Sequence, residues 1–241
     1  MTKNRLMIWT RKAGQFLLRF WPQPLASGGK QIVIAAVGAG LGLMLTSLLC
    51  HWILGEVNLW FIAPVGASAV LVFGVPASPL AQPWSVIGGN TLAAVVGITV
   101  GNLLPHPSIA CGVAGAIAMA LMHKLRCLHP PGGAVAVTAI FGGPTVHALG
   151  YQFVLAPVLL NSVMLVLVGV IFNHLSGRRY PHLPGPVPGP APVAMPYPIS
   201  REDLHEALLS GEMLDIDEDD ARDLLTRAEQ IAARRQAGRA R

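Results

Sequence analysis

HPPGGAVAV, residues 129 to 137, places a histidine, two prolines and two glycines directly before a run of small apolar residues. Proline is favourable in the first turn of a helix, because the backbone N–H that it lacks would be unpaired there anyway. The stretch therefore predicts a helix from about Pro131 to about Phe141. Such a helix is too short to cross a bilayer, which takes about 20 apolar residues. A helix that begins inside an apolar region presents its first backbone N–H groups to whatever lies before it.

The composition is typical of a membrane protein. Charged residues make up 12% of the 241 residues and hydrophobic residues 53%, whereas a soluble domain carries about 25% charged residues. The net charge of +5 comes from Lys and Arg at the two ends and near residue 125, where they flank apolar stretches. This placement is a topology signal and argues against nucleic acid as a partner. The three cysteines have no disulfide-framework spacing.

Six apolar segments can be read along the chain. Four are spans or nearly so, residues 32–54, 85–104, 108–123 and 152–175, and two are interrupted by Pro and Gly, residues 57–75 and 130–143. The fold class predicted is an all-α membrane protein with six membrane segments, four full spans plus two short broken helices, and a small cytoplasmic helical tail.

The two broken segments resemble each other, which indicates an internal repeat. Residues 64–70 and 131–137 share the pattern P-x-G-A-x-A-V. Further on, the twelve-residue spacing from Asn90 to Asn102 recurs from Asn161 to Asn173. Repeat 1 would cover about 31–104 and repeat 2 about 108–175. If each repeat crosses the membrane three times, the two copies are inverted, a plan in which transporters bind their substrate near the midplane.

The positions of Lys and Arg predict the topology. Six crossings put every Lys and Arg, and both termini, on the cytoplasmic side, as the positive-inside rule asks. If the broken segments instead re-enter from one side, only four helices cross, and Lys124 and Arg126 fall outside. We favour six crossings in a bacterial inner (plasma) membrane.

The remaining domain boundaries follow from composition. Residues 1–30 are a basic cytoplasmic or interfacial segment, and residues 31–177 form the transmembrane domain. Residues 178–198 are a proline-rich linker, which is extended and semi-rigid. Residues 199–241 are predicted to form a cytoplasmic helical tail that packs on a partner.

Two helix N-termini that converge from opposite sides would favour a small anion, because each carries about half a positive charge. His129 could add a donor or a titratable charge, and Asn90, Asn161 and Gln82 could tune selectivity. The alternative is that the Pro-Gly stretches are kinks that allow tight packing, and that the amides join helices. The residues predicted to bind substrate are Pro64, Gly66, Ala67, Ser68, Gln82, Asn90, His129, Pro131, Gly132, Gly133, Ala134 and Asn161.

Other chemistries receive little support. His123, Cys127 and His129 have the spacing H-x3-C-x-H, which keeps a metal or cation pathway as a third hypothesis. No carboxylate accompanies them, so no metal and no cofactor is predicted. The sequence has no nucleophile motif, no paired membrane carboxylates and no phosphate-binding loop, so we do not expect an enzyme.

Residues 128–134 (LHPPGGA), with 73–83 (FGVPASPLAQP) and Gly88-Gly89 upstream, resemble the HPP family of integral membrane proteins. The resemblance covers about residues 25–175. The family is described with four membrane spans and as transporter-like, and its plastid and cyanobacterial members are implicated in nitrite transport. The resemblance therefore implies a small-anion substrate, with nitrite first. Its four spans differ from our six segments, which is expected if the two broken segments are scored as non-spanning.

The predicted function is a membrane transporter or channel for a small inorganic anion, with the lipid bilayer and that anion as partners. The alternative is a non-transporting membrane scaffold or sensor that acts through the 199–241 tail. Helices with this many small residues are typical of bundles that oligomerise, so a homo-oligomer is also a candidate, but the sequence does not fix the number of subunits.

Overall fold

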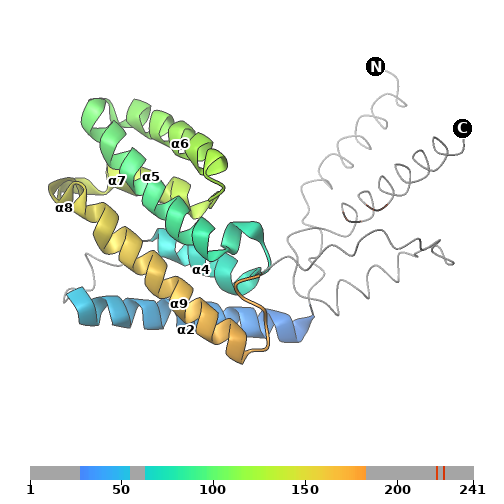
Figure 1. Cartoon of the computed structure of the whole chain (residues 1–241). Helices are drawn as coiled ribbons and strands as arrows, with labels where there is room; N and C mark the ends of the chain where they lie inside the picture. Colours follow the sequence, from blue (N-terminus) through green and yellow to red (C-terminus); the bar gives the residue numbers. More distant parts are fainter. Residues whose placement is uncertain (1–27, 55–62, 183–220, 222–224, 226–241) are drawn as a thin grey trace, which may run out of the picture.

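The computed structural model describes residues 28–54 and 63–182, together with Ala221 and Leu225 (Figure 1). Within those residues the secondary structure is helical, with no strand. The predictions for residues 1–27, for the linker beyond residue 182 and for the tail as a helical unit lie outside the described residues. The same holds for residues 57–62 of the first broken segment.

Four helices are long and apolar enough to cross a membrane. They are α2 (Gly29–Leu54), α5 (Pro83–Leu103), α6 (Pro107–Lys124), and a last span, Val154–Leu175, made of the π-helical η2 (Val154–Leu159) and α9 (Leu160–Leu175). This confirms the four predicted full spans, with boundaries that agree within a few residues. A fifth span is formed only if two bent helices, α7 (Pro131–Phe141) and α8 (Gly143–Leu149), count as one.

The two short helices begin where the proline positions predicted them. The helix α4 covers Pro64–Gly74 and α7 covers Pro131–Phe141, and each has proline in its first turn. Both are too short to cross a bilayer of about 30 Å, since a helix rises about 1.5 Å per residue.

Two local features differ from the sequence-based expectation. Residues 143–149 form a separate helix, α8, which is bent by 96° from α7, because Gly143 adopts a left-handed backbone with φ of 79°. The stretch 152–175 was expected to be one continuous helix. It is broken at Ala156, whose φ of −138° and ψ of 113° are extended, next to Pro157, which lacks a backbone N–H.

The helices pack as two interlocked groups. α5 lies against α6 and α7, while α2 lies against α4 and α9 (Figure 1). Every fourth residue of α2 and of α6 is buried in these contacts, Gly38, Gly42, Thr46 and Cys50 on α2, and Ala110, Ala114, Ala118 and Met122 on α6. The small residues of these two buried rows let neighbouring helices approach closely.

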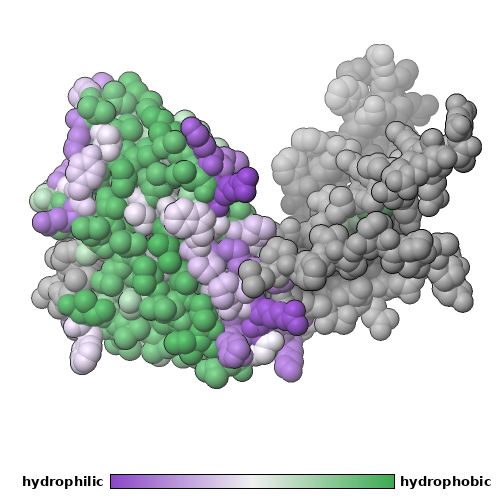
Figure 2. Space-filling view, viewed as in Figure 1, coloured by the Kyte–Doolittle hydropathy of each residue, from purple (hydrophilic) through white to green (hydrophobic). Residues whose placement is uncertain are grey.

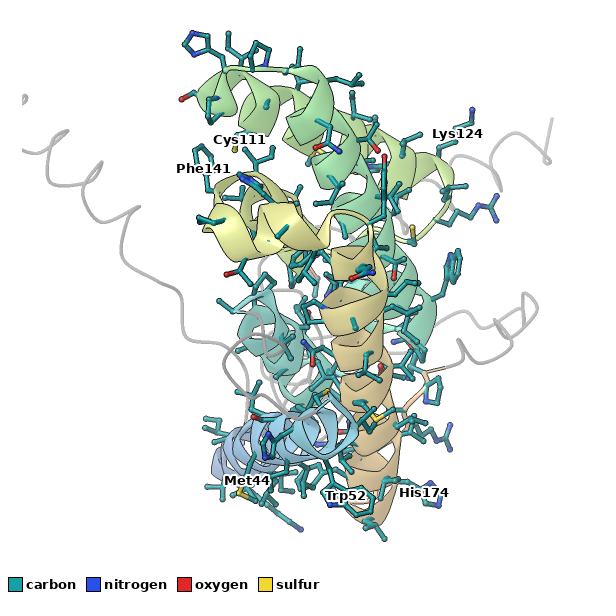
Figure 3. The ribbon with its side chains drawn as sticks, turned by 90° about the vertical axis from the view of Figure 1, so that its left-hand side faces the viewer. Met44, Trp52, Cys111, Lys124, Phe141 and His174 are labelled. Carbon is teal, nitrogen blue, oxygen red and sulfur yellow. The ribbon has the colours of Figure 1, made fainter. Side chains whose placement is uncertain are left out.

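The outer surface is apolar. Large hydrophobic side chains on α2, α6 and α9 are exposed, among them Met44 and Trp52, and the labelled side chains of both point away from the bundle (Figure 3). Figure 2 shows a broad hydrophobic face bordered at its edges by hydrophilic residues. An apolar patch of this extent is unfavourable in water but suits the hydrocarbon core of a bilayer.

The segment after α9, residues 176–182, is hydrogen-bonded to the end of α4 and to the start of α2. Arg178 follows α9, and its guanidinium donates to the carbonyl of Phe73 at 2.7 Å and to that of Gln31 at 2.9 Å. The first carbonyl lies at the C-terminal end of α4, where a cation is favourable. Just beyond, the Tyr180 hydroxyl donates to the carbonyl of Ala81 at 2.9 Å.

Arg178→Ala is expected to destabilise the bundle, because two carbonyls lose a charged donor. The cost should be about 1–3 kcal/mol, since Arg178 is partly exposed and water can replace part of the interaction. Arg178→Lys should fall between the wild type and the alanine variant, because an ammonium lacks the planar fork that reaches both carbonyls. Thermal unfolding in detergent measures this, and an unchanged midpoint for Arg178→Ala would refute it.

Candidate functional site

His129 lies in the connection between α6 and α7, and its side chain is completely buried. Its ring Nδ1 lies 2.8 Å from the carbonyl oxygen of Leu80, and its Nε2 lies 2.8 Å from the hydroxyl of Ser68 (α4). The chain turns inward at Arg126, which has a left-handed backbone with φ of 55°. Gly89 makes room on α5, because a Cβ there would lie 2.6 Å from the Cys127 carbonyl oxygen and 2.7 Å from His129 Cβ.

The hydrogen bonds of His129 define its tautomer. A carbonyl oxygen only accepts, so Nδ1 carries the proton and donates to Leu80. Burial penalises the charged form of the ring, and residues 28–54 and 63–182 contain no carboxylate that could pair with it. The ring is therefore neutral at pH 7, and Nε2 accepts from the Ser68 hydroxyl. The cationic charge that the sequence allowed for His129 is absent in this arrangement.

Two further buried side chains extend the hydrogen-bonded chain across the bundle. The amide nitrogen Nδ2 of Asn90 (α5) lies 3.3 Å from the Ser68 hydroxyl and 3.1 Å from the hydroxyl of Ser162 (α9). All four side chains are at most 2% exposed. We refer to His129, Ser68, Asn90 and Ser162 as the polar cluster. It joins α4, α5, α9 and the α6–α7 connection at one point in the apolar interior.

The cluster lies where the starts of the two short helices meet. His129 directly precedes the prolines that open α7, and Ser68 is in the second turn of α4. The backbone N–H groups expected to face an anion are already used. Gly66 donates to Ala63 at 3.0 Å, Gly132 to His129 at 2.9 Å and Gly133 to Pro130 at 3.0 Å. The side chains, rather than these three N–H groups, remain as the polar groups of the site.

The small residues of the two helix starts have different surroundings. A Cβ on Gly132 would lie 3.1 Å from the Gly89 carbonyl oxygen, so this glycine serves close packing. A Cβ on Gly66 or Gly133 would meet no atom within 4 Å. Of the other residues predicted at these helix starts, Pro64 and Pro131 are buried, whereas Ala67 and Ala134 are exposed.

Two of the predicted residues with polar side chains, Asn161 and Gln82, lie outside the polar cluster. The amide oxygen of Asn161 accepts from the thiol of Cys50 at 2.9 Å, which joins α9 to α2. Gln82 holds the loop before α5, since its amide nitrogen donates to the carbonyls of Pro76 and Ser78, both at 2.9 Å, and its oxygen accepts from the His182 N–H at 2.8 Å.

Two groups of the site were not predicted. Ser162 is absent from the predicted set, although its position beside Asn161 points to it. The carbonyl of Leu80 gave no sequence signal, because any residue has one.

The charged groups near the site are few. Residues 28–54 and 63–182 contain no Asp or Glu. Among the described residues, no group of three His, Cys, Asp or Glu side chains could hold a metal ion. His123, of the third hypothesis, is exposed and its Nδ1 lies 2.9 Å from the carbonyl oxygen of Met119.

A cavity of about 280 Å³ lies apart from the polar cluster, at the C-terminal end of α5. Asn102 and His147 contribute its polar side chains, and Ile98, Ala139 and two glycines line the rest.

The motif that builds this site places the chain among known proteins. Residues 25–181 match the family described as HPP, transmembrane region. The chain belongs to the HPP family. The His-Pro-Pro of residues 129–131 supplies the buried histidine of the polar cluster and the two prolines that open α7. The resemblance drawn from the sequence is confirmed.

Two relatives of this chain are named as transmembrane proteins of Dictyostelium discoideum. One is 37% identical over 125 residues, covering 50% of this chain and 44% of the relative. The other is 29% identical over 164 residues, covering 66% and 52%. The chain thus spans about half the length of the curated relatives it matches. No solved structure matches this HPP-family chain.

Proposed function

We propose that this HPP-family protein carries a small inorganic anion, nitrite first, across a bacterial inner membrane by way of the polar cluster. The observation that carries the proposal is a chain of four buried polar side chains inside a four-span apolar bundle. Polar groups in a membrane interior are costly, and they commonly mark a substrate path. The cluster also lies where two broken helices begin, which is where transporters of this plan bind their substrates.

We further propose that the two halves of the domain are an inverted repeat of three segments each. The packing supports this, because α2 contacts α9 of the other half and α6 contacts α5 of the other half. The buried rows of α2 and α6 have the same four-residue spacing. On the third helices, a Cβ at Gly97 would meet Ala139 of α7, and one at Gly169 would meet Val72 of α4. The partners, Ala139 and Val72, hold equivalent places in the two short helices.

The proposed orientation follows from the basic residues. Lys30 lies at the start of α2, Lys124 and Arg126 at the end of α6, and Arg178 and Arg179 after α9. If α4 and α7 each cross together with the chain that adjoins them, the number of crossings is six and these positions share the cytoplasmic side, as the positive-inside rule asks. Both termini are then cytoplasmic.

Nitrite uptake into proteoliposomes that hold the purified full chain tests the proposal. We expect saturable uptake above that of empty liposomes. Ser68→Ala should lower the rate about ten-fold, because it removes the hydroxyl that joins His129 to Asn90, and one lost buried hydrogen bond is worth about that factor. Ser176→Ala is the matched control, since this hydroxyl bonds only the Phe172 carbonyl within its own helix end, at 2.8 Å.

No uptake above empty liposomes from folded protein would contradict transport. It would favour the alternative, a membrane scaffold or sensor that acts through residues 199–241. If Ser68→Ala and Ser176→Ala lost the same fraction of the nitrite uptake, the polar cluster would not be the path of the anion.

A further inference from the structure

The hydrogen bonds of the polar cluster have a fixed direction. His129 donates through Nδ1 to the carbonyl of Leu80, so its Nε2 accepts from Ser68. The Ser68 hydroxyl also lies 3.2 Å from the carbonyl oxygen of Pro64, but His129 Nε2 is closer, at 2.8 Å, and can only accept, so the hydrogen of Ser68 points to His129. The Ser68 oxygen then accepts from the amide nitrogen of Asn90, and the same nitrogen donates to Ser162. The amide of Asn90 is therefore oriented by the ring rather than free to exchange its oxygen and nitrogen.

This direction of the hydrogen bonds leaves one acceptor and one donor of the cluster available to a solute. Among the described residues, the amide oxygen of Asn90 has no hydrogen-bond partner, although the residue is only 2% exposed. Ser162 accepts from Asn90, which leaves its own hydroxyl hydrogen to donate. The cluster thus offers a carbonyl oxygen beside a hydroxyl donor. A buried carbonyl oxygen without a donor is costly, so the site favours a solute that donates.

The same surroundings disfavour a bare anion. The described basic residues lie at helix ends, and the guanidinium of Arg178 is bonded to the carbonyls of Phe73 and Gln31. The N–H groups of Gly66, Gly132 and Gly133 are bonded to carbonyls one turn earlier. An isolated charge costs far more to bury than a neutral polar group, and the unpartnered oxygen of Asn90 would repel it.

We propose that the polar cluster binds the neutral, protonated form of a small weak acid, so that nitrite passes as nitrous acid. This deepens the proposed function and rests on it. The acid O–H donates to Asn90 Oδ1, and its other oxygen accepts from the Ser162 hydroxyl. No covalent bond changes in the protein. Nitrite takes up a proton on one side and releases it on the other, so that one proton accompanies each nitrite.

The experiment uses proteoliposomes holding the full chain, with a membrane potential set by potassium and valinomycin. Nitrite uptake and internal acidification are measured together, and empty liposomes give the background permeation of nitrous acid. We expect accumulation that does not change with the sign of the potential, with one proton entering per nitrite. Formate should compete, because formic acid is also weak, whereas nitrate should not.

Transport of the bare anion gives a different result. A potential of about 100 mV would change the accumulation of a singly charged solute by about 50-fold, without acidification, and that outcome overturns the inference. Competition by nitrate as strong as that by formate overturns it as well. Absence of any flux above the background contradicts the proposed function itself, and the inference falls with it.

Discussion

Gly89→Ala is expected to destabilise the bundle far more than the same change at the neighbouring Gly88, and to abolish transport. A Cβ at this position would lie 2.6 Å from the Cys127 carbonyl oxygen and 2.7 Å from His129 Cβ. Both neighbours belong to the connection that precedes α7, and the nearer one is backbone, which cannot rotate away. Overpacking of this kind costs about 1–3 kcal/mol or more. The displaced connection would also move His129 away from Ser68.

The adjacent residue provides a matched control. A Cβ at Gly88 would lie 3.3 Å from Cys127 Cβ and 3.4 Å from the Trp84 ring, contacts that a small shift relieves. Both substitutions have the same effect on helix propensity, so their difference reports packing alone. Thermal unfolding in detergent and nitrite uptake should both separate the two variants. The same unfolding midpoint for Gly88→Ala and Gly89→Ala would show that the α6–α7 connection does not lie against α5 as described.

His129→Ala should have the second large effect. The substitution removes a fully buried ring and both of its hydrogen bonds. The Leu80 carbonyl loses its donor from His129, and the Ser68 hydroxyl loses its acceptor there. Cavity formation and unsatisfied polar groups together cost about 2–5 kcal/mol. With Ser68 released, the orientation of Asn90 is lost too, so nitrite uptake should fall to the background of empty liposomes.

Two further variants sharpen this test. His129→Asn can still donate to the Leu80 carbonyl but is too short to reach Ser68, so we expect partial recovery of stability without recovery of transport. His123→Ala removes an exposed histidine outside the cluster and should leave both properties near those of the wild type. If His129→Ala unfolds at the temperature of His123→Ala, the buried hydrogen bonds of His129 do not stabilise the fold.

The HPP motif shows how much of this site a sequence can reveal. The two prolines predicted the start of α7, and the matching Pro64 predicted the start of α4. His129 is a candidate because it is ionisable within the membrane domain, and Asn90 because it has a counterpart in the second repeat; the structure places both in the polar cluster. The sequence did not reveal that Gln82 and Asn161 bond elsewhere, because an amide has equally good partners in loops and in neighbouring helices.

The first turn of α7 has a different role in the fold from the one that its sequence predicts. The N-terminal dipoles suggested free backbone donors, whereas Gly132 and Gly133 donate to the carbonyls of the residues just before α7. Pro130, which directly precedes α7, already has helical backbone angles, with φ of −53° and ψ of −39°. The carbonyls of His129 and Pro130 therefore accept the first N–H groups of α7. Sequence patterns give the position of a helix start, but not the backbone angles that precede it.

By itself, the sequence determined that this chain is a membrane protein of the HPP family, with four long apolar helices and two short ones opened by proline. These features depend on local composition and on residues a few positions apart. Only the tertiary structure decided which polar groups meet. Ser68 and His129 are 61 positions apart, and their contact depends on the close approach of the α6–α7 connection to Gly89. Such contacts follow from side-chain volumes and helix packing across the whole bundle, which no local pattern in the sequence contains.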